Sequence, residues 1–183
     1  RRIAVTRHPP HGGSIEIRSE IPFGVGLGSS AALCVALSRA VGAQGRERLW
    51  CLAHQAEHAF HGSPSGVDTG LSILGNVQKF TQSGSDAVPV AEQIRVSDLL
   101  LVVGYVPRAG DTAAYVAAVR GRMNAGENIV RSAIDRLGKI AQDACILLAA
   151  NDSGRVSKLG CLADEADALL AIIGLALQLW VSC

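Results

Sequence analysis

The sequence feature that most constrains the fold is a glycine-rich segment, PFGVGLG at residues 22–28, followed directly by SSAA. Glycine lets a backbone turn sharply and lets a ligand approach without a Cβ in the way. The preceding residues 14–21 alternate apolar and polar side chains, which predicts a strand. The following residues 29–41 are small and aliphatic, and they predict a helix opened by serine. The segment therefore joins a strand to the amino end of a helix.

The amino end of that predicted helix is suited to a polyphosphate. The N–H groups of a first helical turn have no partner within the helix, and the helix dipole adds positive potential there. Ser29 and Ser30 add hydroxyls that could bond a phosphate oxygen or bind Mg²⁺, a hard ion that prefers oxygen. The structural alternative is a glycine-rich connector with a serine cap, and the loop alone leaves both interpretations open.

Two other phosphate-binding loops do not match this segment. A Walker A loop needs lysine directly before its serine or threonine, and the segment contains no lysine. The dinucleotide fingerprint G-x-G-x-x-G requires glycine at position 29, where serine stands.

Two carboxylates follow the loop in the sequence. Glu57 lies at the edge of the apolar face of a helix predicted over residues 47–61, which makes it a candidate magnesium ligand. Asp68 ends the segment HGSPSGVD, residues 61–68, where proline and glycine predict a turn. Such a turn can aim a carboxylate at a substrate hydroxyl. The carboxylate could then orient that hydroxyl or remove its proton in phosphoryl transfer. The structural alternatives are that Glu57 pairs with an arginine or His61, and that Asp68 caps a turn.

A second motif in this helix indicates different chemistry. The residues HQAEH, from His54 to His58, match the inverted zinc-peptidase signature H-x-x-E-H. The two histidines share a helix face, as zinc ligands must, but that face is predicted to point away from the apolar stripe. We therefore expect two exposed histidines here, with a zinc peptidase as the lesser alternative.

The rest of the chain predicts an α+β pattern. We expect strands over residues 71–80 and 98–106, the second of them buried, with a loop between them marked by Gly84, Asp86 and Pro89. Helices are predicted over residues 112–120, 127–150 and 162–181. The strand-rich half gives way to the helix-rich half near residues 97–110.

The charge balance disfavours nucleic acid as a partner. The chain has 17 basic and 16 acidic side chains and a formal net charge of +1, whereas phosphate neutralisation requires clustered lysine and arginine. The most apolar stretch, residues 169–181, is shorter than a membrane span. Five scattered cysteines and the absence of a charged-then-apolar leader favour free thiols in a reducing compartment. We expect the cytoplasm, with a peroxisome-like organelle as the open alternative.

Considered jointly, the loop and the carboxylate segment resemble the GHMP kinases, the superfamily of galacto-, homoserine, mevalonate and phosphomevalonate kinases. PFGVGLGSSAA is similar to the ATP-phosphate loop of that superfamily. Residues 57–68 read E-x-x-x-H-G-x-P-S-G-[IV]-D, which is typical of its mevalonate kinase branch. A weaker likeness continues through residues 106–120.

The resemblance implies ATP-dependent phosphorylation of mevalonate, with Mg²⁺ as cofactor and ATP as co-substrate. It implies that Ser30 and Glu57 hold Mg²⁺, that Asp68 is the catalytic base for the mevalonate 5-hydroxyl, and that Thr112 lies near the active site. The residues implied to cradle the ATP phosphates are Gly24, Val25, Gly26, Leu27, Gly28, Ser29 and Ser30. A sister kinase of the superfamily and a catalytically inactive nucleotide-binding protein stay open as alternatives.

The resemblance also implies a two-lobed α+β fold with ATP in the cleft between the lobes. Residues 1–97 would form a βαβ-type amino-terminal lobe that lacks its first strands, and residues 98–183 a truncated, ferredoxin-like carboxy-terminal lobe. An amino-terminal lysine strand and a late T-G-A-G-G-G motif have no match in this sequence. We therefore expect part of a longer protein, weakly active or inactive by itself. We expect neither nucleic acid nor membrane as a partner, and a homodimer is compatible with the sequence.

Overall fold

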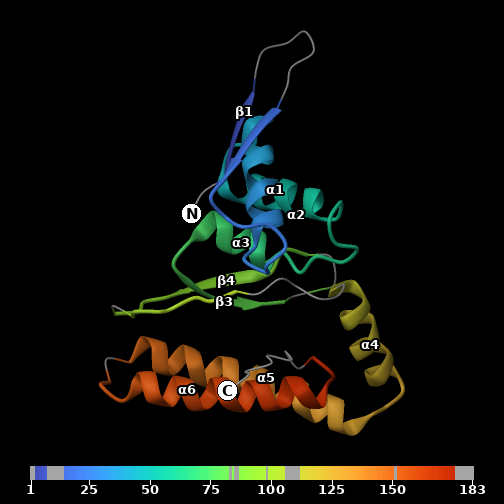
Figure 1. Ribbon diagram of the computed structural model, residues 1–183, viewed down its shortest axis with the longest axis vertical. Helices are drawn as coiled ribbons and strands as arrows, with labels where there is room; N and C mark the ends of the chain where they lie inside the picture. Colours follow the sequence, from blue (N-terminus) through green and yellow to red (C-terminus); the bar gives the residue numbers. More distant parts are fainter. Residues whose placement is uncertain are drawn as a thin grey trace. The chain divides into compact units, whose positions relative to one another are not determined.

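The computed structural model describes residues 3–7, 15–82, 84, 87–97, 99–105, 112–150 and 152–175. These residues form both helices and short strands (Figure 1), which confirms the mixed α+β class. The elements in chain order are β1 (Ile3–Arg7), β2 (Ile15–Ser19), α1 (Ser29–Ala40), α2 (Arg46–Glu57), α3 (Val67–Leu74), β3 (Val77–Thr81), β4 (Val90–Ile94), α4 (Thr112–Asn124), α5 (Asn128–Ala149) and α6 (Arg155–Ile172).

The chain divides into two compact units. The first takes its described residues from 1–93 and 101–109, and the second takes them from 94–100 and 110–183. The first unit holds the glycine-rich loop and both candidate carboxylates. The second unit is built from α4, α5 and α6.

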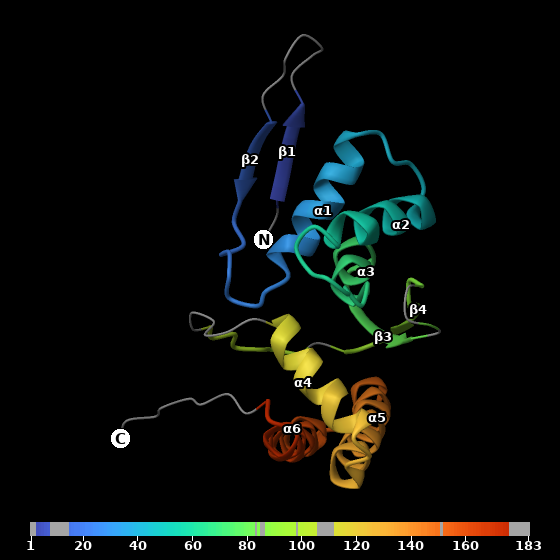
Figure 2. The same ribbon diagram turned by 90° about the vertical axis from the view of Figure 1, so that its right-hand side faces the viewer.

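The first unit begins with an antiparallel pair of strands. β2 confirms the predicted strand, whereas β1 was not predicted, although Ile3 and Val5 alternate with other residues as in a strand. In the register of the pair, Val5 lies opposite Ile17 and Arg7 opposite Ile15. β1 contacts α1, and Figure 2 shows the pair running alongside that helix. The glycine-rich loop therefore runs from the end of this sheet to the start of α1.

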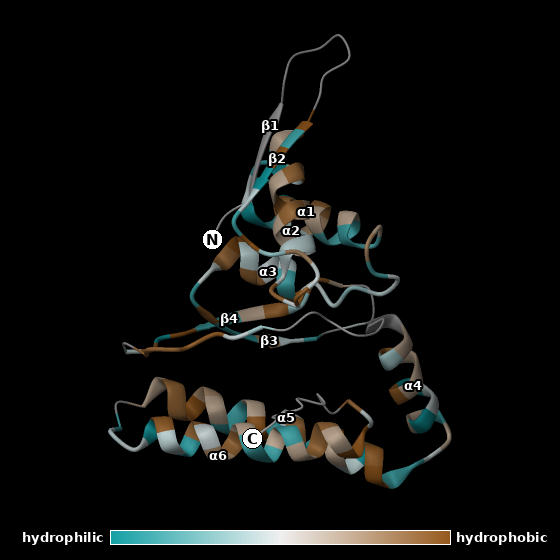
Figure 3. Ribbon diagram, viewed as in Figure 1, coloured by the Kyte–Doolittle hydropathy of each residue, from teal (hydrophilic) through white to brown (hydrophobic). Residues whose placement is uncertain are grey.

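The core of the first unit lies where α1 packs against α2. Small side chains on α1 let the two helices approach closely, and Figure 3 shows hydrophobic residues concentrated on α1. The helix α2 begins at Arg46 and ends at Glu57, four residues before the predicted end. The buried members of the cluster are Cys34, Val35, Leu49 and Ala53, with Ala43, Ala56 and Ile73 packed against them.

Helix α3 corrects two sequence predictions. Residues 61–68 were expected to lack regular structure and 71–80 to form a strand, but residues 67–74 are helical and only 77–81 form a strand. The helix begins after Gly66, whose φ of 75° is a left-handed conformation that glycine adopts readily. It ends where Gly75 and Asn76 are both left-handed, at φ values of 65° and 55°. Two such residues in succession turn the chain out of the helix and into β3.

The third correction concerns the apolar run predicted as a buried strand over residues 98–106. Residues 99–105 have no regular structure, and Leu100 and Val102 are 94% and 97% exposed. The strand paired with β3 is instead β4, in the region predicted as a loop, and Lys79 of β3 lies 3.7 Å from Glu92 of β4. A strand needs a neighbour for its N–H and C=O groups, and among the described residues 99–105 join neither sheet.

The second unit is helical. α4 and α5 confirm the predicted helices, whereas α6 begins at Arg155, seven residues before the predicted start. The helix ends at Ile172, and the prediction that it continues is wrong for residues 173–175, where Gly174 turns the chain with a φ of 86°. The predicted helical residues 176–181 lie outside the described residues. The buried members of its core are Val130, Ala133 and Ile173, with Val119, Met123, Ile134, Leu137, Leu169, Leu170 and Leu175 packed against them.

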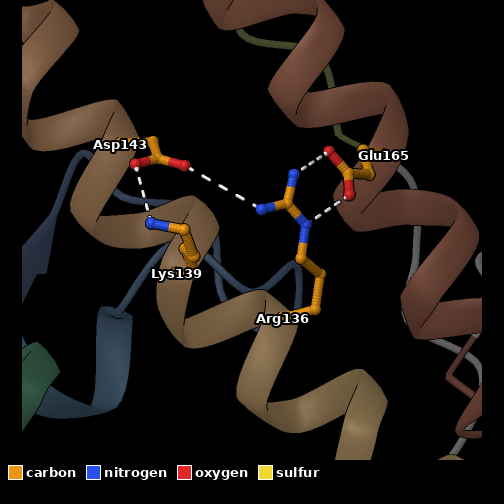
Figure 4. A network of polar contacts seen from close by, with 4 residues as sticks. All are labelled: Arg136, Lys139, Asp143 and Glu165. Atoms are coloured by element: carbon orange, nitrogen blue, oxygen red, sulfur yellow. Dashed lines mark hydrogen bonds and ion pairs between the residues drawn. The ribbon is translucent and has the colours of Figure 1, made fainter.

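A polar network joins α5 to α6. Arg136 donates from Nε to one oxygen of Glu165 at 2.6 Å and from Nη2 to the other at 2.7 Å. Figure 4 shows Arg136 reaching across to Glu165 while Asp143, on its own helix, lies near both Arg136 and Lys139. The two parallel hydrogen bonds favour one rotation of each helix about its own axis, because a guanidinium and a carboxylate match in one planar arrangement.

The described helices include none that is both long enough and apolar enough to cross a membrane.

Candidate functional site

The glycine-rich loop has an unusual backbone. Gly24, Gly26 and Gly28 have φ values of 75°, 77° and 68°, all in the left-handed region that other residues rarely adopt. A Cβ built on any of the three would meet no atom within 4 Å. Glycine is therefore required at these positions by the backbone conformation and not by neighbouring atoms. The space beside the loop backbone is open to a ligand.

The amino end of α1 carries no side-chain cap. The cap residue is Gly28 and not a serine as predicted, because Ser29 already lies inside the helix. Intrahelical hydrogen bonding begins with the N–H of Ala32, which donates to the carbonyl of Gly28 at 3.0 Å. The N–H groups before Ala32 have no acceptor within the helix, as at any helix start. Together with the helix dipole, they form a positive end suited to an anion.

Ser30, which follows the glycine-rich segment, lies close to His61, which begins the segment HGSPSGVD. The Oγ of Ser30, in the first turn of α1, lies 3.3 Å from the Nε2 of His61, and both residues are half-buried. His61 follows the end of α2, where its backbone N–H donates to the carbonyl of Glu57 at 2.9 Å. The sequence offers His61 only as a partner for Glu57. In the sequence, only the spacing of four residues between Glu57 and His61 indicates that these two residues belong to one site.

Glu57 is a buried carboxylate. Glu57 is the last residue of α2, and only 3% of its surface is exposed. Burial, together with the smaller effect of the nearby negative charge of Asp68, raises the pKa of Glu57 to about 7. A carboxylate held in this way is destabilised in its ionised form, so a cation near it would be stabilised.

Asp68 lies in the first turn of α3, and it is exposed. An acidic residue is favourable at this position because the helix dipole places positive potential there. The charge of Asp68 acts on Glu57, so the structure brings the two predicted carboxylates into one electrostatic environment. One carboxylate of the pair is therefore shielded from solvent and the other is open to a substrate.

Cys34 forms the buried floor beside this pair. Cys34 is fully buried in α1, and burial together with the nearby charge of Glu57 raises the pKa of its thiol to about 11. The thiol is therefore protonated at neutral pH and is a poor nucleophile. It serves as a packing residue.

The donor chemistry of the site fits a hard cation. Ser30 offers a hydroxyl and Glu57 and Asp68 offer carboxylates, which are the oxygen donors that Mg²⁺ prefers. The mutual repulsion of the two carboxylates is relieved by a positive charge near them. In the part of the chain that the structure describes, no three side chains of His, Cys, Asp or Glu are grouped to hold a metal. Waters and phosphate oxygens commonly supply the remaining ligands of Mg²⁺.

The two histidines of the H-x-x-E-H motif do not lie as predicted. His58 is exposed, but His54 is only 5% exposed, and its ring centroid is 5.5 Å from that of His58. The prediction that both point to solvent is wrong for His54 because α3 covers that side of α2. A Cβ on Gly66 would lie 3.2 Å from the Nδ1 of His54. His54 is therefore a packing residue beneath the start of α3.

Thr112 is the first residue of α4, in the second unit. Its place near the active site stays a prediction.

Comparison with known proteins identifies the class. Residues 2–76, which contain the loop and both carboxylates, match the family described as GHMP kinases N terminal domain. This part of the chain therefore belongs to the GHMP kinase family. The resemblance noted from the sequence is confirmed.

Within that family the chain is similar to mevalonate kinases. It is 33% identical over 169 residues to the mevalonate kinase of Pyrococcus horikoshii, covering 88% of this chain and 49% of the relative. It is 31% identical to that of Archaeoglobus fulgidus, covering 96% of this chain and 58% of the relative. For the Arabidopsis thaliana enzyme the identity is 29%, over 79% of this chain and 42% of the relative. The chain thus spans about half the length of the curated relatives it matches.

Proposed function

We propose that this chain carries the phosphate-loop part of a mevalonate kinase, an enzyme that transfers the γ-phosphoryl group of ATP to the 5-hydroxyl of mevalonate. The observation that carries the proposal is the open glycine loop at the uncapped amino end of α1, with a buried and an exposed carboxylate beside it. Similarity to proteins named mevalonate kinase over most of the chain supports the choice of substrate.

The loop and the first turn of α1 bind the phosphates of ATP. Gly24, Gly26 and Gly28 leave open space beside the backbone, and the N–H groups of the first turn of α1 point along the helix axis toward its amino end. These dipoles are fixed by the fold before ATP arrives. They stabilise the negative charge of the transferring phosphoryl group without reorganisation.

Ser30 and Glu57 would hold Mg²⁺, which would supply positive charge to neutralise the phosphates. Glu57 suits this role because its ionised form is destabilised by burial and by Asp68, so the cation is the partner that its charge lacks. A cation beside Glu57 would also offset the free-energy cost of burying its ionised carboxylate.

Asp68 accepts the proton of the mevalonate 5-hydroxyl. It is exposed, and it is held in the first turn of a helix whose start is fixed by hydrogen bonds to Gly66. A carboxylate in this position orients the hydroxyl and removes its proton as the new bond to phosphorus forms. The proposal extends to the architecture, with residues 1–97 in an amino-terminal lobe and 98–183 in a ferredoxin-like lobe that carries Thr112 near the site.

The test is a phosphoryl-transfer assay with labelled ATP and four acceptors: mevalonate, phosphomevalonate, galactose and homoserine. We expect transfer to mevalonate in preference to the other three. We expect Asp68→Asn to lower kcat by at least about a hundredfold, the size of a typical general-base effect. The control is Asp135→Asn, which removes an exposed aspartate from α5 and leaves kcat unchanged.

Preferred transfer to another acceptor contradicts the choice of mevalonate and favours a sister kinase. Because only weak activity is expected of the chain by itself, the assay is run at high chain concentration. Nucleotide binding without any detectable transfer then favours an inactive nucleotide-binding protein.

A further inference from the structure

We propose that His61 is a positioning residue of the phosphate loop: its Nε2 accepts a hydrogen bond from the hydroxyl of Ser30 and so turns the lone pairs of that oxygen toward the bound cation. The inference rests on the proposed function, since it concerns how Ser30 is presented to Mg²⁺ and ATP.

The geometry begins with the contact itself. Ser30 Oγ and His61 Nε2 are 3.3 Å apart, although the two residues are 31 positions apart in the sequence. Both are half-buried, so water competes with the contact less than it would at an exposed surface. Hydrogen bonds of an active site are commonly longer without the ligand and tighten when it binds.

The backbone holds His61 in place for this contact. The carbonyl of Glu57 accepts from the N–H of Phe60 and from the N–H of His61, each at 2.9 Å. These bonds close a turn at the end of α2, so the position of His61 is tied to that of Glu57. The turn therefore links the backbone position of the imidazole-bearing residue directly to that of the carboxylate-bearing residue.

The chemistry of serine determines what this contact does. A serine hydroxyl has one hydrogen to donate and two lone pairs to accept with. If its hydrogen is directed to His61, only lone pairs face the ligand, which suits a cation. If His61 donates instead, the hydrogen of Ser30 faces the ligand, which suits a phosphate oxygen. The role of Ser30 as a magnesium ligand favours the first arrangement, because it leaves both lone pairs of the oxygen for the cation.

The first test is which ring nitrogen of His61 carries the hydrogen. We expect a two-bond ¹H–¹⁵N NMR spectrum of the chain, with its histidines ¹⁵N-labelled, to show Nε2 of His61 without hydrogen at pH 8. We also expect the Nε2 signal to move in Ser30→Ala, because the donor is lost. A hydrogen on Nε2, or an Nε2 signal that Ser30→Ala leaves in place, overturns the inference.

The second test is a double-mutant cycle on nucleotide affinity. Titration calorimetry with ATP and Mg²⁺ is expected to show a three- to tenfold weaker affinity for His61→Ala, about the effect of one hydrogen bond. Ser30→Ala is expected to weaken affinity at least as much, and the double variant no more than Ser30→Ala alone. With EDTA present, we expect His61→Ala to bind ATP as the wild type does.

Two further variants separate positioning from general structure. His61→Gln places a side-chain carbonyl that can accept from Ser30, and we expect it to restore part of the lost affinity. His58→Ala removes an exposed histidine from the same end of α2, and we expect it to change nothing.

The outcomes distinguish the inference from the function on which it rests. If the wild-type chain binds no nucleotide, the proposed function fails, and the NMR result decides the hydrogen bond by itself. Two results would contradict the positioning role and leave the proposed function standing, provided that the wild type binds ATP. One is that the losses of affinity in His61→Ala and Ser30→Ala add in the double variant. The other is that His61→Ala weakens ATP affinity as much with EDTA as with Mg²⁺.

Discussion

The indole of Trp50 donates its Nε1–H to the carbonyl of Gly66 at 3.0 Å, across from α2 to the start of α3. The same carbonyl accepts from the hydroxyl of Thr69 at 3.0 Å and from the N–H of Gly70 at 2.9 Å. Three donors on one oxygen fix the first turn of α3. Asp68 lies in this turn, so a side chain of α2 determines where the proposed base points.

The packing beneath this turn leads to the first prediction. A Cβ on Gly70 would lie 2.3 Å from Cζ2 of Trp50 and 3.0 Å from Cε1 of Phe80, so Gly70→Ala must displace an aromatic ring. We expect a loss of about 1–3 kcal/mol in the free energy of unfolding, the usual cost of overpacking. Urea denaturation followed by circular dichroism measures it.

The matched control is Gly138→Ala on the exposed face of α5, where a Cβ meets no atom within 4 Å. It should raise stability by about 1 kcal/mol, as expected for glycine replaced by alanine within a helix. Equal effects of the two substitutions would contradict the close packing of Trp50 on α3.

The second prediction concerns pH. The pKa of Glu57 is about 7 in the folded chain and near the ordinary 4.5 when unfolded, so between these values the folded state binds more protons. Folding stability must then fall as pH rises from 4.5 to 7, by about 2–3 kcal/mol from this group. Glu57→Gln removes that slope and is more stable than the wild type at neutral pH.

Thermal denaturation across this pH range, with and without Mg²⁺, tests the prediction. Adding Mg²⁺ should flatten the slope of the wild type and leave Glu57→Gln unaffected. The control Glu47→Gln changes an exposed carboxylate at the start of the same helix and should keep the wild-type slope. If the wild type and Glu57→Gln instead show the same change in stability from pH 5 to pH 7, burial does not raise the pKa of Glu57 and the prediction is wrong.

The third prediction concerns the loop backbone. Gly26 has a φ of 77° with open space around it, so Gly26→Ala strains the chain without a clash. We expect a loss of about 1–2 kcal/mol in stability, the cost of a left-handed conformation for alanine, unless the loop changes its path. Either result should weaken ATP affinity by at least about tenfold, because the phosphates need the original backbone.

Fluorescence titration with a labelled ATP analogue measures that affinity. Gly160→Ala, an exposed position in α6 where a Cβ meets no atom, is the control and should bind as the wild type does. Unchanged affinity in Gly26→Ala would argue against phosphate contact at the loop.

The fourth prediction concerns the second unit. Hydrogen bonding and the charge of Glu165 raise the pKa of Arg136, and the same contact lowers that of Glu165. Arg136→Lys keeps the charge but loses the planar pair of hydrogen bonds, so we expect a lower melting temperature. Glu165→Gln in the Arg136→Lys background should lower it little further. Additive losses in the two single variants would mean that the residues do not act as a pair.

Elements set by local pattern were predictable from the sequence. β2 follows from apolar alternation, α1 from small and aliphatic residues that begin after a glycine, and α5 from helical periodicity. The exposed run at 99–105 was not predictable, because whether an apolar run becomes a strand depends on a neighbour that its own residues do not specify. Helix α3 was missed because its start depends on Trp50 and Thr69 holding the carbonyl of Gly66.

The candidate site divides in the same way. The glycine loop, Glu57 and Asp68 are visible in the sequence because each lies in a short motif with a chemical reason for its spacing. The contact between Ser30 and His61 joins two motifs through the packing of α1 against α2, so it required the fold. The burial of His54 was missed for the same reason, since α3 covers a helix face that looks polar in the sequence.

The central claim is that the amino end of α1 and the loop before it bind the phosphates of ATP. An ¹H–¹⁵N NMR titration of the chain with ATP and Mg²⁺ tests this most directly, because it reports on each backbone amide. We expect the largest shifts to fall on the amides of residues 24–31. Saturating shifts elsewhere with those amides unmoved, or no shifts at millimolar ATP, would contradict it.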